Sequence, residues 1–494
     1  MAVSLVFGTV FGITIGFGSA LIGEAVDYSI YYFVQAGRSG TDEWRRRFWP
    51  TVRLGVLTSV AGFGTLLFSG FPGLSQLGLY SLSGVAAAAL VTRFVLPQLA
   101  GSNHSVPDLG GLGRILSRMA VRLRALRWAV LLLAGAAVVH MWIDRSTLWS
   151  PDLSALSTVS AADVAHDQAL RSDISAPDAR YVVVVTAPDR EQALQAAEAA
   201  GRQLDRLVAE GVIGGYDSPA RFLPSQAAQR TRLAALPDAD ALRTRLAAAV
   251  TDLPVSASRL SPFIEDVEST RRQPLIDRAT LNGTGLALVV DSLLMQRDNG
   301  WSVLLPLHPT KADSELTIPS DQVRAALAGT GALFIDMKGE FDRLYSDYLG
   351  EVKILSLAGI VTICLLLAVT LRSLRRLLRI SLPLALAVLL VIGGLHAIGE
   401  KLHLLHLIGM LLIVAVGSNY ALFFDRRTDE GLPEPATLAS MAIANLTTAI
   451  GFGTLGLSSV SVLHTIGITV GPGAVLALVL SAMFVPRETK EAAR

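Results

Sequence analysis

The sequence predicts a polytopic α-helical membrane protein with about nine spans, an internal parallel repeat and one extracytoplasmic α+β domain. Three observations predict this fold class. Hydrophobic residues make up 51% of the 494 residues and charged residues 17%, against about 25% charged residues in soluble domains. Apolar runs of spanning length recur along the chain, and two distant segments carry matching motifs. Only residues 144–350 have the composition of an aqueous domain.

The spans are predicted from apolar runs of about 20 residues, the helix length that crosses a bilayer core of about 30 Å. Nine such runs occur, at residues 8–34, 52–70, 74–98, 125–143, 352–371, 378–398, 403–424, 437–457 and 463–485.

The loops between these spans alternate in charge. Arginines gather in every second loop, at 45–47, 114–124, 372–379 and 426–427. The opposite loops, 69–75, 399–401 and 458–462, hold one lysine. Because positively charged loops stay in the cytoplasm, we expect a multi-pass membrane protein. Its C-terminus is predicted to be cytoplasmic and residues 144–350 to lie outside.

The outer segment, 144–350, is predicted to be a compact α+β or α/β domain. Strand-like runs lie at 181–187, 284–294, 301–308 and 331–337. Residues 189–211 have helical periodicity, with Asp189 as a predicted N-cap and Gly211 as a predicted stop. A charged helical stretch covers about 224–279.

An internal repeat relates the two ends of the chain. LTSVAGFGTL (57–66) matches LTTAIGFGTL (446–455) with seven identities in ten, and the match continues without a gap to Pro97 and Pro486. Small residues at fixed places favour close packing of helices. The glycines predicted to have this role are Gly62, Gly64, Gly451 and Gly453.

Upstream of the GFGTL motif, VDYSIYYF (26–33) aligns with SNYALFFD (418–425). Asp27 then pairs with Asn419, and Tyr28 pairs with Tyr420. Both copies cross the membrane in the same direction, so the repeat is parallel.

The repeat predicts the division of the chain. The three spans of the first copy occupy 1–99, and the five spans of the second copy occupy 351–486. Between them we expect a cytoplasmic linker at 100–124, an anchoring span at 125–143 and the outer domain at 144–350, with a cytoplasmic tail at 487–494. Because the first copy is shorter, we expect an N-terminally truncated form or fragment of a transporter with twelve spans. The alternative is a natural half-size variant that needs a partner chain.

These motifs resemble the RND superfamily, and within it the MMPL-type exporters of lipids or aryl-polyene pigments. The resemblance rests on the large outer domain, the two parallel halves, the intramembrane DY and the GFGTL helix. It implies an RND/MMPL-like membrane repeat with a porter-like outer domain. It also implies a proton relay at the centre of the bundle, with Asp27 and Tyr28 on one helix and Asn419 and Tyr420 on the other. The expected cross-pairs are Asp27 with Tyr420 and Tyr28 with Asn419.

The sequence departs from this pattern at Asn419, where the family usually carries a second acid. An amide cannot take up and release a proton near neutral pH. Glu24 lies three residues before Asp27, on the same helix face, and is predicted to supply the second carboxyl. Two carboxyls buried this close titrate as a coupled unit. Whether Glu24 faces the relay or an aqueous cavity stays open at the level of sequence.

A purely structural interpretation competes with the proton relay, since Asp27 could form only a structural hydrogen bond between helices. An acid inside the membrane costs roughly 2.5–3.5 kcal/mol or more, which favours a functional role. Tyr28 and Tyr420 could likewise be packing aromatics. Thr58, Thr65, Thr447 and Thr454 recur in register. Their hydroxyls are predicted to bond back to helix carbonyls, and the alternative is that they hydrate the relay.

The sequence offers no catalytic motif. It has no Walker A, GxSxG or HExxH pattern and a single cysteine, Cys364, so we expect no enzyme activity, no cofactor and no metal site. His396, His403 and His406 form a predicted cluster at the outer end of two spans, where solvation is the ordinary interpretation. The net charge of +1 gives no reason to expect a nucleic-acid partner.

The resemblance therefore implies proton-motive-force-driven export of a hydrophobic or lipid-like molecule across a bacterial inner membrane, with residues 144–350 in the periplasm. The expected partners are that substrate, protons and membrane lipids, and self-association stays open. The alternative is a non-transporting sensor or scaffold of the sterol-sensing-domain type, or an inactive fragment.

Overall fold

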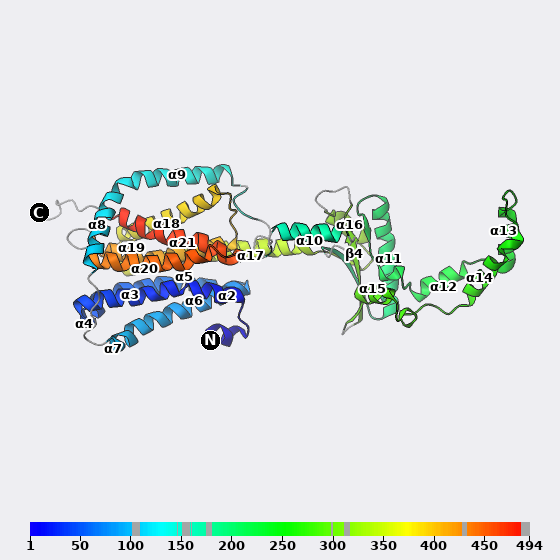
Figure 1. Cartoon of the computed structure of the whole chain (residues 1–494), viewed down its shortest axis with the longest axis horizontal. Coiled ribbons are helices and arrows are strands. Elements are labelled where there is room, and N and C mark those ends of the chain that lie inside the picture. The colour runs from blue at the N-terminus through cyan, green and yellow to red at the C-terminus, as the bar shows by residue number, and fades with distance from the viewer. Residues whose placement is uncertain are drawn as a thin grey trace. The chain divides into compact units, whose positions relative to one another are not determined.

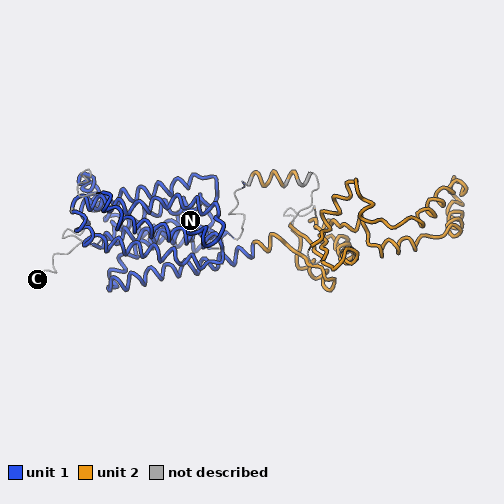
Figure 2. The backbone as a smooth tube through the Cα atoms, turned by 90° about the horizontal axis from the view of Figure 1, so that it is seen from below, with its two compact units in different colours: residues 1–160, 342–494 blue, residues 161–341 orange. Residues whose placement is uncertain are grey.

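The computed structural model describes residues 1–100, 109–145, 147–150, 159, 161–173, 180–297, 300–310, 317–426 and 432–485. The chain forms two compact units (Figure 2). Unit 1 comprises residues 1–160 and 342–494, and unit 2 comprises residues 161–341. Unit 2 is thus shorter at both ends than the predicted outer domain. The predicted tail, 487–494, lies outside the described residues.

Unit 1 is a bundle of helices. Its first part contains α1 (Ala2–Phe7), α2 (Gly12–Ala20), α3 (Ile22–Ser39), α4 (Thr41–Arg47), α5 (Trp49–Leu66), α6 (Pro72–Leu90), the π-helix η1 (Val91–Val95), α7 (Leu96–Leu99), α8 (Gly110–Leu123), the 3-10 helix η2 (Arg124–Leu126) and α9 (Arg127–Ile143). Its second part contains α17 (Met337–Leu371), α18 (Leu374–Ala397), α19 (Leu404–Asp425), α20 (Pro435–Leu455) and α21 (Ser461–Met483).

Within the described residues, seven helices are long and apolar enough to cross a membrane, and they correspond to seven of the nine predicted spans. The other two predicted spans are shorter or more polar than expected. The run 8–34 is divided, because Gly8 has a φ of 72° and α2 and α3 meet at Leu21. Helix α5 has 18 residues and includes Arg53. Both nevertheless lie beside the other helices of unit 1 (Figure 1).

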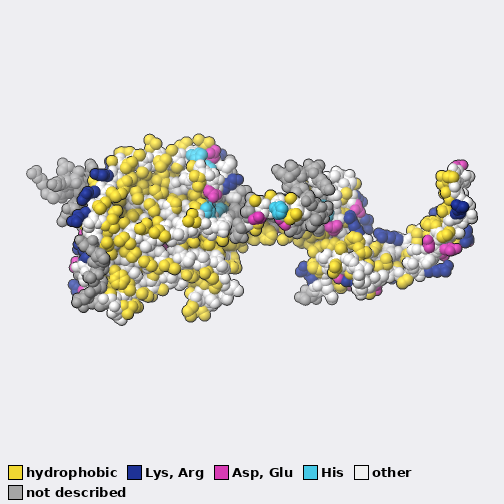
Figure 3. Space-filling model, viewed as in Figure 1, with side chains coloured by type: hydrophobic (Ala, Val, Ile, Leu, Met, Phe, Trp, Pro, Cys, Tyr) yellow, Lys and Arg dark blue, Asp and Glu magenta, His cyan; other side chains and the backbone are white. Residues whose placement is uncertain are grey.

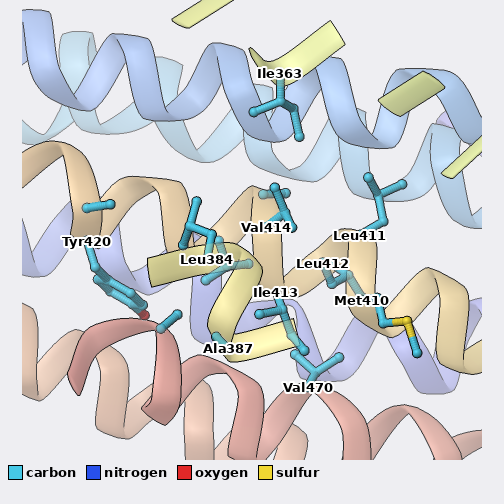
Figure 4. Packing of buried hydrophobic residues seen from close by; sticks show 14 of the residues in the cluster. Ile363, Leu384, Ala387, Met410, Leu411, Leu412, Ile413, Val414, Tyr420 and Val470 are labelled. Atoms are coloured by element: carbon cyan, nitrogen blue, oxygen red, sulfur yellow. The ribbon is translucent and has the colours of Figure 1, made fainter. Parts of the chain in front are cut away.

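Helix α19 is the centre of the bundle, and the whole of its apolar window is buried. Figure 4 shows its side chains among those of the neighbouring helices, with Ile363 from α17, Leu384 from α18 and Val470 from α21. Because every face of α19 is covered by protein, its polar side chains contact other helices rather than lipid.

The two copies of the repeat pack across each other. Helix α3 of the first copy packs against α20 of the second, and α5 of the first copy packs against α19 of the second (Figure 1). Each GFGTL helix therefore contacts the DY helix of the other copy. The contact is close at Gly23, where a Cβ would lie 3.0 Å from the Cα of Thr448.

The predicted linker at 100–124 contains a helix that packs on the bundle. Residues 101–108 lie outside the described residues, but α8 contacts α20 and α21. The contact requires a glycine, since a Cβ on Gly113 would lie 1.9 Å from the carbonyl oxygen of Pro435. The predicted linker thus includes a helix that contacts the second membrane copy.

Unit 2 is an α+β domain with a five-stranded sheet. The strands are β1 (Tyr181–Ala187), β2 (Gly215–Tyr216), β3 (Leu294–Arg297), β4 (Gly300–His308) and β5 (Leu333–Asp336). They have the order β2-β4-β1-β5, β3 also pairs with β4, and all pairs are antiparallel. In register, Val184 of β1 lies opposite Leu304 of β4 and Leu333 of β5.

Helices surround or extend from this sheet. They are α10 (Ala161–Asp173), α11 (Arg190–Ala209), η4 (Pro219–Arg221), α12 (Gln226–Ala234), α13 (Ala239–Ala249), η5 (Ala257–Leu260), α14 (Ser261–Arg272), η6 (Ala279–Leu281), α15 (Gly285–Leu293) and α16 (Ser320–Leu327). Helix α11 begins as predicted, with Asp189 accepting a hydrogen bond from the Gln192 amide. It is followed by Gly211 at a φ of 72°.

One strand prediction is wrong. Residues 285–293 form α15, and the strand β3 begins only at Leu294. The buried residues Ala287, Val290 and Leu293 recur every third position, which is a helical spacing. Most residues of this segment are apolar, so its helical period cannot be recognised from the sequence alone.

Candidate functional site

The five predicted relay residues are all buried in unit 1. Glu24, Asp27 and Tyr28 lie on α3, and Asn419 and Tyr420 lie on α19. None of the five is more than 5% exposed. Acidic side chains are almost never buried this fully unless they have polar partners. The partners come from α5 and α20.

Asp27 has three hydroxyl neighbours from the second copy of the repeat. Thr447 donates to its Oδ1 at 3.2 Å, and Thr448 donates to its Oδ2 at 3.3 Å. The Tyr420 hydroxyl lies 3.5 Å from the same Oδ2, at the outer limit of a hydrogen bond. The predicted pair of Asp27 and Tyr420 is therefore brought together.

These partners satisfy Asp27 in either protonation state. The Thr447 hydroxyl also lies 2.7 Å from the carbonyl oxygen of Ala444, and its one hydrogen can serve only one acceptor at a time. An ionised Asp27 can accept from Thr447, Thr448 and Tyr420. A protonated Asp27 can donate to Thr447 Oγ1, while Thr447 keeps its bond to Ala444. The site can thus hold or release a proton without orphaning a hydroxyl.

Glu24 faces α5. The Ser59 hydroxyl donates to its Oε1 at 2.8 Å. Its Oε2 is buried and has no hydrogen-bond partner among the described residues. A buried polar atom without a partner costs about 1–3 kcal/mol, so this carboxyl is less well satisfied than Asp27. Among the described residues, Glu24 is fully enclosed by protein, with no exposed surface.

The repeat explains why Ser59 is available to Glu24. Ser59 aligns with Thr448, which donates to Asp27 in the other half of the site. By symmetry Ser59 would serve residue 419, but it donates to Glu24 instead. In position and partner, Glu24 therefore takes part of the place that an acid at 419 would fill.

Asn419 lies against α5 at a glycine. A Cβ on Gly55 would lie 1.8 Å from Asn419 Oδ1, so the amide can pack here only because Gly55 has no side chain. The equivalent residue in the second copy is Ala444. The Tyr28 hydroxyl lies near Glu24, Ser59 and Asn419, but it forms no hydrogen bond of good geometry with a described residue.

Thr447, Thr448 and Ser59 complete the site. Of these three, only Thr447 was considered from the sequence as a possible neighbour of the relay. Their signal was their position in the repeated LTSVAGFGTL and LTTAIGFGTL segments. The predicted bonds to helix carbonyls are all present. They are donated by Thr58, Thr65, Thr447 and Thr454 to Gly55, Gly62, Ala444 and Gly451, respectively.

The four motif glycines differ in how tightly they are packed. A Cβ on Gly62 would lie 3.3 Å from Ile363, and a Cβ on Gly451 would lie 3.3 Å from the Ala20 carbonyl oxygen. Gly453 is approached by Gly471, whose Cβ would lie 3.4 Å from it. At Gly64 the nearest atom would be 3.9 Å away, which is ordinary contact.

The predicted cluster of three histidines is divided in the structure. His403 and His406 pack edge to face at the start of α19, with ring centroids 4.3 Å apart, and His403 is 3.0 Å from the Thr465 hydroxyl. His396, at the end of α18, instead packs against His140 of α9, with ring centroids 4.7 Å apart and the rings tilted by 41°.

Three comparisons with known proteins bear on the family. No curated protein matches this chain. A crystal structure of SecDF in its super-membrane-facing form has a TM-score of 0.45 and 14% sequence identity, covering 96% of this chain and 53% of the SecDF chain. This chain thus spans about half the length of SecDF. The MMPL family model matches residues 310–487, so the predicted MMPL resemblance is confirmed over a range that includes the second membrane copy.

Proposed function

We propose that the chain is the proton-coupled part of an RND-type exporter that moves a hydrophobic or lipid-like molecule across a bacterial inner membrane. Asp27 carries the proton in this proposal, and Glu24 is the second carboxyl of the coupled pair. In this proposal the polar side chains of Asn419, Tyr28 and Tyr420 position and solvate the two carboxyls. The chain acts as a transporter and not as an enzyme, and it uses no cofactor in moving the substrate.

The observation that carries the proposal is the environment of Asp27. It is a fully buried carboxyl at the contact between the two copies of the repeat, with hydroxyl partners that suit both its protonation states. A carboxyl needed only to tie α3 to α20 would not require partners that adapt to proton loss. Because α3 and α20 belong to different copies, a proton at Asp27 changes the contact between the copies.

The test is proton movement through the purified chain in liposomes of phosphatidylethanolamine and phosphatidylglycerol. Pyranine inside the liposomes reports proton entry after an imposed pH gradient, and a fluorescent acyl lipid serves as the export probe. We expect Asp27→Asn to lower lipid-stimulated proton entry at least tenfold, because the amide cannot carry a proton. Asp27→Glu should retain a measurable part of it.

Ser440→Ala provides a matched control, since Ser440 is buried on α20 and, among the described residues, its hydroxyl bonds only to the carbonyl of Thr437. It should leave proton entry unchanged. Equal proton entry in the unmodified chain and in Asp27→Asn would exclude Asp27 as the proton carrier. Lipid binding without proton movement in any variant would favour the sensor or scaffold instead.

A further inference from the structure

We propose that His140, Asp144 and His396 form a binding site for a divalent first-row metal ion of the Zn²⁺ class, which ties α9 to α18. The three side chains each offer one ligand atom, and these atoms all lie within 4.8 Å of one another. His140 and Asp144 are four residues apart at the end of α9, and His396 is in the last turn of α18. In Figure 3, histidine and acidic side chains lie together at this end of α9.

The distances suit ligands around an ion better than a hydrogen-bonded cluster. His140 Nδ1 is 3.4 Å and His396 Nε2 is 3.8 Å from Asp144 Oδ2. A good N–H···O hydrogen bond is about 2.7–3.2 Å long. In a tetrahedral site with bonds of about 2.1 Å, ligand atoms are about 3.4 Å apart. Small side-chain rotations bring all three atoms to that spacing.

His396 provides a second, independent observation. Its side chain is 9% exposed, and its Nε2 is buried with no hydrogen-bond partner among the described residues. That nitrogen is the one directed at Asp144. The neighbouring guanidinium of Arg145 lies over the Trp142 ring, 5.7 Å from its centroid. A metal ion between the three side chains would satisfy the His396 nitrogen.

The backbone holds the two helix ends in place on both sides of the cluster. One turn before the histidines, a Cβ on Gly393 would lie 2.6 Å from the Cβ of Ala137, so the helices are in close contact there. Just after α9, the Ser150 amide donates to the Leu402 carbonyl at 2.8 Å, and the Leu402 amide donates to Leu148 at 2.8 Å. The ligands are therefore preorganised.

The donor set points to the class of metal. Two imidazoles and one carboxylate suit Zn²⁺ and its first-row neighbours, whereas Mg²⁺ and Ca²⁺ prefer oxygen ligands alone. Three protein ligands leave a fourth position for water. Such a link would stabilise the position of α9 in particular, because little of this helix is buried by its neighbours. Only 6% of the most apolar part of residues 110–143 is buried.

The test is metal binding by the full chain, purified in detergent without a histidine tag and stripped with a chelator. We expect one Zn²⁺ per chain by elemental analysis, and a tetrahedral Co²⁺ absorption spectrum that Zn²⁺ abolishes. His140→Ala, Asp144→Ala and His396→Ala should each weaken binding at least tenfold. His166→Ala is the matched control, since His166 is exposed on α10 in unit 2, and it should bind as the unmodified chain does.

Variants at His140 and Asp144 also provide a control for folding, because the side chains of these two residues are 46% and 45% exposed. The His140→Ala and Asp144→Ala variants should keep the unfolding temperature of the metal-free chain and lose the increase that Zn²⁺ gives the unmodified chain. Undiminished Zn²⁺ binding in the double variant, or no stoichiometric binding by the unmodified chain, would show that the cluster is not a metal site.

Discussion

At the scale of single residues, the absence of one side chain determines where Asn419 lies. The amide oxygen occupies the position that a Cβ on Gly55 would take. In the repeat, Ala444 aligns with Gly55 and Asp27 aligns with Asn419. The two halves of the site therefore differ at both of these aligned positions.

Gly55→Ala should destabilise the chain. The new Cβ would overlap Asn419 Oδ1 at 1.8 Å, and overpacking of this kind costs about 1–3 kcal/mol. The double variant Gly55→Ala with Asn419→Ala should recover most of that loss, because the overlapping atoms are gone. Thermal unfolding in detergent measures both effects.

Gly84→Ala on α6 is the matched control, since no atom lies within 4 Å of a Cβ placed there. It should unfold at or above the temperature of the unmodified chain. Destabilisation by Gly55→Ala that persists in the double variant would mean that another neighbour, and not Asn419, opposes the methyl group.

The chemistry of the site could be predicted residue by residue only where the repeat supplied a comparison. Asp27, Tyr28, Asn419 and Tyr420 were found by aligning the two copies. The hydroxyl partners Ser59 and Thr448 lie in the same aligned segments, but sequence does not show which helix faces α3. That depends on the packing of α3 against α20, between residues about four hundred positions apart.

At the scale of elements, charged side chains fasten helices to one another. Asp425, the last residue of α19, is 4% exposed in its side chain and pairs with Arg376 of α18. Its Oδ2 accepts from Arg376 Nε at 2.7 Å. In unit 2, Glu191 of α11 accepts from the amides of Gln226 and Ala227 at the start of α12. These partners come from distant sequence, so neither contact could be read from local pattern.

Glu191→Gln should weaken the contact between α11 and α12 in a pH-dependent way. Partial burial raises the pKa of Glu191, but hydrogen bonds from Gln195 and from the Gln226 and Ala227 amides outweigh it, and the net pKa is lowered. A lowered pKa stabilises the fold above the pKa of unfolded glutamate, about 4.3, and this stabilisation is lost as the pH falls through the folded value.

The expected loss at pH 7 is below about 1 kcal/mol, because a negative charge at an exposed helix N-terminus stabilises by about 0.3–1 kcal/mol. Amide exchange of residues 225–234 in the full chain measures it. Glu265→Gln, at an exposed position on α14, should exchange as the unmodified chain does. A difference between Glu191→Gln and the unmodified chain that persists at pH 3 would exclude the carboxylate charge as the cause.

At the scale of the whole molecule, composition and the repeat predicted the class of fold, the MMPL resemblance and most of the membrane helices. The errors have physical causes. Gly8 and the break between α2 and α3 at Leu21 interrupt the first predicted span. Arg53 and hydroxyl side chains make α5 less apolar, and a continuous apolar run conceals the helical period of α15. The metal-ligand cluster could not be predicted, because His140 and His396 are brought together only by the packing of α9 on α18.

The proposed orientation gives a test for the whole chain. Figure 3 shows Lys and Arg side chains gathered at one end of unit 1, the end at which Figure 1 places α4 and α8. In a Cys364→Ala background, Asp240→Cys in unit 2, where the side chain is 93% exposed, should react with an impermeant maleimide on intact spheroplasts. Arg46→Cys on α4 should react only after permeabilisation. Reaction of Arg46→Cys on intact spheroplasts would reverse the orientation.

The packing of α3 on α20 has a consequence for how the protein is made. Asp27 and its partner Thr448 are separated by 421 residues, and chains are synthesised at about 5–20 residues per second. Asp27 therefore waits roughly 20–85 s in the membrane before Thr448 emerges from the ribosome. During that interval it lacks the hydroxyl groups that later satisfy it, whereas Ser59, the partner of Glu24, follows that glutamate by only 35 residues. Protonation from the surrounding water is the simplest way to lower the cost of the unpartnered Asp27, so the proton that the finished site handles is first needed during biosynthesis.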